Sequence, residues 1–190
     1  MRAELIHGRS NNEYYTPRYA VLPILRYIPR GKTVWAPFDT PDSEFVRAMH
    51  DADIPCVYSH LCYGQDFFSY EPSQWDLIVS NPPFRGKTDI LARSIALGKP
   101  FALLLTNNCL SEIGPMRQFM GIDLQLLMFD RRIEFNPTKG GSPFGSSYFC
   151  RGILPRPIII EHLERVNKQQ SSMYADSDLM AYLSNRLVHK

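Results

Sequence analysis

The sequence lacks the features of several protein classes. Its longest apolar runs, 101–105 and the proline-interrupted 153–160, are too short to span a bilayer, and its start does not resemble a signal peptide. We therefore expect no membrane association. The four cysteines form no C-x-x-C pair and stand near no histidine pair, so neither a metal site nor a disulfide framework is expected and a reducing cytoplasm fits best. These cysteines are Cys56, Cys62, Cys109 and Cys150.

A strong net charge is also missing. The formal charge of +2 is too small to indicate nucleic-acid binding, although basic residues gather in the C-terminal part of the chain. The 190 residues can bury one good core. We expect a single domain over residues 1–170, followed by a C-terminal helix or tail at 171–190.

The pattern that is present alternates between strands and helices. Residues 76–80 and 101–106 are continuous apolar runs, as expected for strands covered on both faces. The other expected strands are 33–38, 55–60, 124–130 and 147–154, and the expected helices are 18–28, 42–53, 88–98 and 111–120. This order predicts an α/β fold with a mostly parallel, doubly wound sheet and an antiparallel C-terminal edge strand. Ligands of such sheets bind at the carboxyl ends of the strands.

An unusual corner, Asn81-Pro82-Pro83-Phe84, follows the apolar run at 76–80. Two prolines remove two N–H donors and hold the chain extended, so the corner is rigid and rich in acceptors. The side-chain oxygen of Asn81 and the carbonyl of Pro82 can accept both hydrogens of a planar amine, with Phe84 against its face. That would free the nitrogen lone pair for attack on a carbon held in line. The alternative is an ordinary turn after a strand.

The corner resembles the catalytic motif of S-adenosylmethionine-dependent amino-methyltransferases, chiefly the adenine-N6 class. The flanking segments "YYTPRYA", "VWAPFD" and "GQDFF" precede "SNPPF" in the order of that family, and the resemblance covers roughly residues 13–150. It is closest to small adenine methyltransferases of phages and prophages. The resemblance implies a Rossmann-like methyltransferase fold, S-adenosylmethionine as cofactor and a location in the cytoplasm of a bacterial or phage-infected cell.

The resemblance also implies a cofactor site. Its members would be Tyr15, Thr16 and Pro17 beside the methionine part, Pro37, Phe38 and Asp39 beneath it, and Asp66 and Phe67 at the adenine. The chain departs from the family at Ala36, where a carboxylate is usual, and at 38–43, where a glycine-rich turn is usual. Each assignment has a structural alternative: helix capping for Thr16, core packing for the phenylalanines and turn capping for Asp66.

A duplex hides the adenine amine, so such an enzyme must flip the base or act on an unpaired one. Aromatic and basic side chains suit stacking and phosphate contact. The candidates for nucleic-acid binding are Arg85, Lys87, Arg131, Arg132, Lys139, Phe144 and Tyr148. The chain leaves little surface for sequence recognition, so specificity is short or absent, or a partner chain or homodimer supplies it.

Three alternatives to DNA adenine methylation stay open. The first is adenine in RNA. The second is the side-chain amide of a protein glutamine, although Phe84 favours adenine because related glutamine enzymes more usually carry tyrosine there. The third is a binding module that has kept the fold and lost activity, which Ala36 and the missing glycines support.

Overall fold

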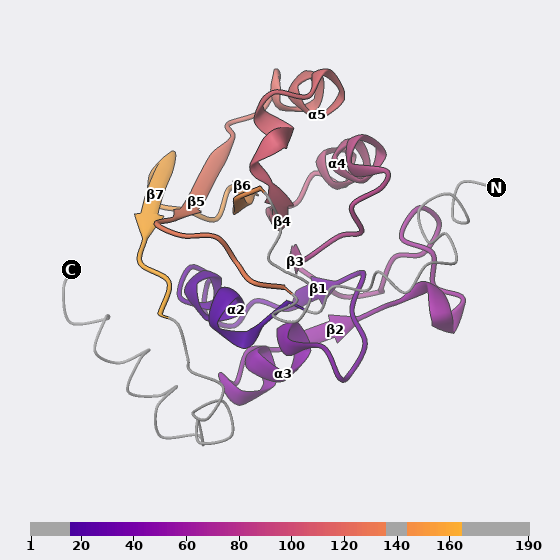
Figure 1. The fold of residues 1–190 in the computed structure, drawn as a ribbon. Helices are drawn as coiled ribbons and strands as arrows, with labels where there is room; N and C mark the ends of the chain where they lie inside the picture. Colours follow the sequence, from indigo (N-terminus) through magenta and orange to yellow (C-terminus); the bar gives the residue numbers. More distant parts are fainter. Residues whose placement is uncertain (1–15, 136–143, 165–190) are drawn as a thin grey trace.

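The described residues form one seven-stranded sheet with helices on both faces (Figure 1). The computed structural model describes residues 16–135 and 144–164. The strands are β1 Val34–Ala36, β2 Cys56–Tyr58, β3 Leu77–Ser80, β4 Phe101–Thr106, β5 Gln125–Phe129, β6 Ser146–Arg151 and β7 Ile158–Glu161. The helices are α2 Arg18–Leu25, α3 Glu44–Asp51, α4 Lys87–Ala96 and α5 Ile113–Phe119, with short 3-10 helices at Leu61–Tyr63 and Asn107–Leu110.

The predicted α/β fold class is confirmed. The strand order is β2-β1-β3-β4-β6-β5-β7, and β2, β1, β3 and β4 run parallel. Every residue of β3 and β4 is buried, as their unbroken apolar sequences predicted. The helices α2 and α3 cover one face and α4 and α5 the other (Figure 1).

Alternate residues of β3 belong to two different hydrophobic cores, one on each face of the sheet. Leu77 and Val79 pack with α2 and α3, whereas Ile78 packs with α4. Successive side chains of a strand point to opposite faces of the sheet, and here both sets are packed in a hydrophobic core.

The prediction of a C-terminal edge strand is partly wrong. The predicted antiparallel strand exists as β6, but it lies between β4 and β5 and is antiparallel to both. Its residues 146–150 are all buried, which an edge position would not require. The outer strand is β7, parallel to β5. Sequence analysis missed β7 because Pro155 and Pro157 looked like breaks within the run, whereas both prolines precede the strand.

Two further expectations can be compared with the structure only in part. In the part of the chain that the structure describes, no helix is both long and apolar enough to span a membrane. The predicted C-terminal helix or tail at 171–190 lies outside the described residues.

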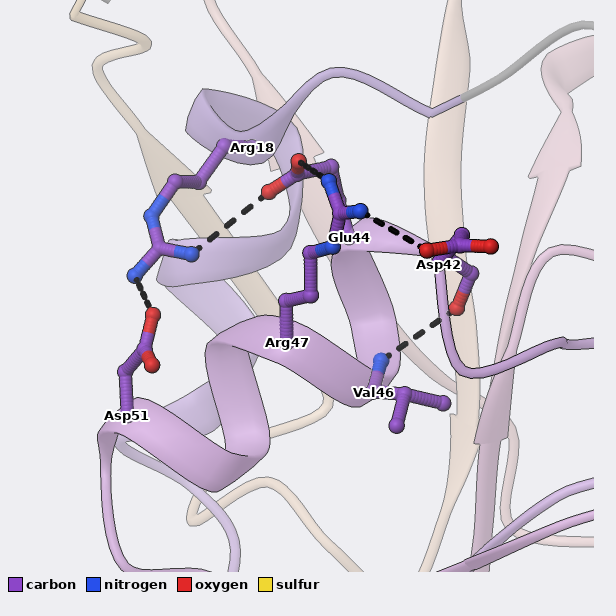
Figure 2. Close-up of polar contacts among 7 residues, drawn as sticks. Arg18, Asp42, Glu44, Val46, Arg47 and Asp51 are labelled. Carbon is purple, nitrogen blue, oxygen red and sulfur yellow. Dashed lines mark hydrogen bonds and ion pairs between the residues drawn. The ribbon is translucent and has the colours of Figure 1, made fainter. Parts of the chain in front are cut away.

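Ion pairs join α2 to α3, the helix that follows the loop after β1 (Figure 2). Arg18 of α2 contacts Asp51 at 2.7 Å and Glu44 at 3.5 Å, one near each end of α3. The hydroxyl of Ser43 accepts the backbone N–H of Val46 and caps α3. Residues 37–43 therefore form a loop between the end of β1 and the capped start of α3.

Tyr148 is a core residue, and its predicted contact with nucleic acid is wrong. Its side chain is 0% exposed and packs edge-on against Phe45. Its hydroxyl donates a hydrogen bond of 2.9 Å to the carbonyl oxygen of Ala20 in α2. Burial raises the pKa of this phenol well above its usual value. Tyr148 thus ties β6 to α2 and presents no ring to a ligand.

Replacement of Tyr148 by Phe should lower the free energy of unfolding by about 1 kcal/mol, because it leaves the Ala20 carbonyl without this donor. Urea denaturation measures the change, and Tyr58→Phe, at an exposed position, is the control with no expected loss. Weaker nucleic-acid binding by Tyr148→Phe at unchanged stability would contradict the structural role.

Candidate active site

Several chain segments meet at one edge of the sheet. The parallel strands β1, β3 and β4 all end there, so Pro37, Asn81 and Asn107 follow strand ends that lie close together. Because β6 is antiparallel to β4, its first residue, Ser146, pairs with Thr106 at the same edge. This is the edge where sheets of this kind bind their ligands.

The corner after β3 opens onto a pocket at this edge. All four of its residues line the pocket, together with the ends of β4 and β6. The lining residues are Asn81, Pro82, Pro83, Phe84, Lys87, Leu104, Leu105, Thr106, Phe135 and Ser146. Pro82 is buried, whereas Phe84 is 43% exposed. The rigid corner thus combines an anchored backbone with an accessible aromatic ring.

The side chain of Asn81 is held by the first residue that the structure describes, Thr16. Its Nδ2 donates a hydrogen bond of 2.9 Å to Oγ1 of Thr16, 65 positions away in the sequence. The amide nitrogen is thereby engaged, which leaves Oδ1 as the acceptor of this side chain.

The structure corrects the prediction that Thr16 caps the first helix. Pro17 occupies the N-cap position of α2, and no side chain caps that end. The Thr16 hydroxyl bonds to Asn81 instead. The Thr-Pro pair therefore marks both a helix start and a site residue, and a sequence pattern alone cannot separate the two roles.

A second polar link lies beneath the corner. Ser80, the last residue of β3, donates its hydroxyl proton to Oδ2 of Asp39 at 2.5 Å. Asp39 is only 7% exposed and also accepts a hydrogen bond from the Ser43 side chain. Burial raises the pKa of Asp39 to about 6, against a smaller lowering by the two serine hydroxyls.

The other predicted cofactor residues have mainly structural contacts. Phe67 is 3% exposed, and its ring lies 5.4 Å from that of Trp35 and 4.9 Å from that of Phe38. Asp66 accepts the backbone N–H of Phe68 at 3.1 Å and so caps a turn. The core and turn interpretations thus explain both residues at the predicted adenine end. Pro37 is buried and Phe38 is half-buried beside Asp39.

The predicted phosphate-binding residues differ in their surroundings. Arg85 is exposed, whereas Lys87 is paired with Glu112 at 2.9 Å. Arg131 contacts Asp130 at 3.4 Å, and Arg132 is exposed. Phe144 is 48% exposed. Tyr15 and Lys139 lie outside the described residues.

The segment between β5 and β6 begins and ends at the pocket edge, because these two strands are antiparallel. Two hydrogen bonds anchor its described ends. The N–H of Glu134 donates to the hydroxyl of Tyr19, and the N–H of Asn107 donates to the carbonyl of Gly145 at 2.8 Å. Arg131, Arg132 and Phe144 therefore belong to the same edge as Asn81.

Sequence analysis missed several polar residues of the site. Ser80 and Thr106 each end a buried strand, and that position was the available signal, because a polar residue there faces the ligand edge. Glu112 and Ser146 carry no such signal, since their roles depend on pairing between distant segments. Across residues 16–135 and 144–164, no group of three or more potential metal ligands is found.

Comparison with known proteins gives only distant likenesses. No protein-family model and no curated protein matches the sequence. Among solved structures, the chain is similar to a type I restriction-modification methyltransferase subunit from Streptococcus thermophilus, with 11% identity and a TM-score of 0.49 over 92% of this chain and 53% of that one. The chain thus spans about half the length of that subunit.

Two other solved structures show a comparable likeness. One is a predicted O-methyltransferase from Agrobacterium tumefaciens, with 10% identity and a TM-score of 0.44 over 86% of this chain and 95% of that one. The other is a putative class I S-adenosylmethionine-dependent methyltransferase from Listeria monocytogenes, with 11% identity and a TM-score of 0.46 over 94% and 73%. These likenesses are weak, so the function proposed below rests on the site itself.

The surroundings of Asp39 predict a pH-dependent stability. Its pKa of about 6 in the fold exceeds the ordinary 3.8, so the fold favours the protonated form. This contribution is complete below about pH 4 and is lost as the pH rises through about 6. It amounts to roughly 3 kcal/mol, since one pKa unit corresponds to about 1.4 kcal/mol.

The Asp39→Asn variant should therefore lose that pH dependence and gain stability relative to the wild type between about pH 4 and pH 7. Chemical denaturation at a series of pH values measures it. Asp42→Asn, at an exposed carboxylate, should keep the pH dependence of the wild type. If Asp39→Asn also keeps it, Asp39 titrates normally.

Proposed function

We propose that this chain transfers a methyl group from S-adenosylmethionine to the exocyclic N6 amine of adenine in nucleic acid, most readily DNA. The observation that carries the proposal is the placement of Asn81-Pro82-Pro83-Phe84 at the carboxyl edge of the central strands, lining a pocket. A rigid, acceptor-rich corner at a ligand edge is what activation of a planar amine requires.

The amine would be activated by two oxygens of the corner. With Nδ2 of Asn81 engaged by Thr16, Oδ1 is available to accept one amine hydrogen. The carbonyl of Pro82 accepts the other, and the two prolines keep both acceptors in place. Drawing both hydrogens away from the ring plane returns the nitrogen lone pair to the nitrogen, where it can form a bond to carbon. No general base is needed before that bond forms. As it forms, the bond between the methyl carbon and the donor sulfur would break and a neutral thioether would leave, and the methylated amine would then lose one proton to solvent.

The residues around Asp39 fit a positively charged methyl donor. Asp39 is a buried carboxyl group, and within the described ranges no lysine, arginine or histidine forms an ion pair with it. Buried carboxylates are costly without a cation nearby, so a cationic ligand at this edge would offset that cost. Thr16, Pro17, Pro37 and Phe38 would border such a ligand. When bound, S-adenosylmethionine supplies the electrophilic methyl carbon.

The accessible groups at the pocket edge suit a flipped or unpaired base. Phe84 offers a flat surface beside the acceptors, and Phe144 is a second exposed aromatic ring at this edge. Arg85 and Arg132 are exposed cations that can contact phosphates. The proposal includes either a short recognition sequence or a partner chain that supplies specificity.

Asn81→Ala should abolish methyl transfer with little effect on cofactor binding, because the side chain acts on the acceptor amine. The fold should lose about 1 kcal/mol with the bond to Thr16. The measurement is mass spectrometry of digested DNA, RNA and protein from cells that express either the wild type or the variant. New N6-methyladenine that depends on Asn81 is the expected result.

Other outcomes of this experiment would overturn the proposal. Asn81-dependent methylglutamine in protein would move the substrate class from nucleobase to side-chain amide. In a separate calorimetric titration, failure to bind S-adenosylmethionine would indicate a binding module that has kept the fold and lost activity. Undiminished methylation by Asn81→Ala would remove Asn81 from the mechanism.

The two basic residues that follow the corner should differ in their effect on nucleic-acid binding. Arg85→Gln should reduce the slope of log affinity against log salt by about one, because an exposed cation releases a counterion from DNA. Lys87→Gln should have a smaller effect, since Glu112 already compensates that charge.

Fluorescence anisotropy with a labelled oligonucleotide at several salt concentrations measures both slopes. Arg156→Gln is the matched control, because Arg156 is exposed and precedes β7, at the opposite edge of the sheet. An equal loss of slope for Arg156→Gln would show that binding is not centred on the pocket.

A further inference from the structure

A buried hydrogen bond connects the loop after β1 to the last residue before the Asn-Pro-Pro-Phe corner. Ser80 is 0% exposed, and its hydroxyl reaches Oδ2 of Asp39. Asp39 is bonded in turn to Ser43, which caps α3. One carboxyl group therefore joins the end of β3, the end of β1 and the start of a helix.

Ser80 directly precedes Asn81, so its hydrogen bond to Asp39 restrains the backbone at the start of the corner. On the far side of Ser80 the strand is fixed by the sheet, and beyond Asn81 the chain is stiffened by two prolines. The orientation of the Asn81 side chain thus depends on the backbone between Ser80 and Pro82 and on the hydroxyl of Thr16. Both polar supports of the corner come from distant parts of the sequence.

A carboxylate at position 39 is a costly choice if only packing were required. It is buried, and among the residues that the structure describes its partners are the two serine hydroxyls rather than a cation. An amide or a small apolar residue would fill the space without the desolvation of a charge. A cationic donor would offset this cost when it is bound, and the bond from Ser80 gives the charge of Asp39 a second effect, on the corner itself.

We propose that Ser80 and Asp39 form a positioning pair that holds Asn81 in the orientation that accepts the amine hydrogens, and that protonation of Asp39 releases this hold. The inference rests on the proposed methyl transfer for its effect on rate. The link itself is a property of the fold and can be tested without activity.

Protonation changes the link because of hydrogen-bond polarity. An ionised Asp39 accepts from both serine hydroxyls, and such charge-assisted bonds are short and strong. A protonated carboxyl keeps one oxygen that accepts, but it has lost its charge, so its bond from Ser80 is weaker, and its protonated oxygen must find an acceptor of its own. The pKa of about 6 places this change within the working range of most cells.

The other titratable groups facing Asp39 do not change charge in that range. Cys56 on β2 has its pKa raised to about 12, first by burial and then by the charge of Asp39. Tyr148 on β6 has its pKa raised well above the usual value, mainly by burial. Ser80 of β3 and Ser43 before α3 do not titrate. Of these groups only Asp39 titrates near pH 6, and loss of the response in Asp39→Asn is what would assign it to this residue.

The test uses Ser80→Ala and Asp39→Asn, with Ser94→Ala as control, since Ser94 is also a buried serine but donates to the Ile90 carbonyl within α4. In the full-length protein, the side-chain amide signals of Asn81 are followed by nitrogen-15 NMR from pH 5 to 8 and assigned by their loss in Asn81→Ala. We expect them to titrate near pH 6 in the wild type and in Ser94→Ala. In Ser80→Ala and Asp39→Asn the titration should disappear.

Kinetics provides the second measurement. Ser80→Ala should lower kcat by roughly tenfold to a hundredfold with little change in KM for the donor, as expected for a misplaced catalytic group. Asp39→Asn retains an oxygen acceptor for Ser80, so it should lose less kcat than Ser80→Ala. It should also lose the inflection of kcat/KM near pH 6, because that profile reports the protein before the cationic donor binds. The proposed pair would be refuted if Ser80→Ala and Asp39→Asn both kept the kcat and the pH profile of the wild type. It would also be refuted if the Asn81 signals of the wild type did not change with pH.

The two proposals fail in different ways. A wild-type protein that methylates nothing but shows the Asn81 titration would refute the proposed function and retain the link. Active enzyme without the titration would do the reverse. If Ser80→Ala fails to fold, Asp39→Asn and the wild-type titration still decide the question.

Discussion

The site depends on one constraint: two adjacent prolines follow, after a single asparagine, a strand that is buried on both faces. The strand cannot shift, because every residue of β3 is buried. The proline rings restrict the backbone dihedral angles at positions 82 and 83. Asn81 lies between these two rigid parts. The remaining freedom of Asn81 is restricted by the hydrogen bond that it donates to Thr16 and by the one that its neighbour Ser80 donates to Asp39. Preorganisation of this kind is what electrostatic catalysis needs.

The polar supports carry a cost that the rest of the fold must offset. A buried carboxyl group beside two serines lowers stability when it ionises, whereas the two hydrophobic cores on either side of the sheet raise it. The ion pairs of Arg18 join α2 to α3, but they lie near the surface and contribute little energy. The two helices are held together mainly by the packing of residues such as Val21, Ile24 and Phe45 in one hydrophobic core.

Much of the fold could be predicted from the sequence, because unbroken apolar runs such as 101–106 have few other interpretations. The place of β6 inside the sheet could not, since a strand's neighbours depend on pairing between segments far apart in sequence. In the site, the corner was visible as a motif, whereas Tyr148 was misjudged because a tyrosine among glycines and arginines looks like a surface residue. Its burial follows from the register of β6 against β4, which no local pattern contains.

The segment that leaves β5 and returns as β6 has a consequence for how the pocket can be varied. Its two ends are pinned at the pocket edge by Tyr19 and by Asn107, and a side chain at Gly145 would approach the Asn107 amide to 2.9 Å. Because both anchors belong to the scaffold, a stretch inserted or exchanged between them would leave the strand register untouched, and loop length itself adds little entropic cost. If the proposed function holds, exchange of this stretch would change the contacts at the pocket without moving the strands that hold Asn81.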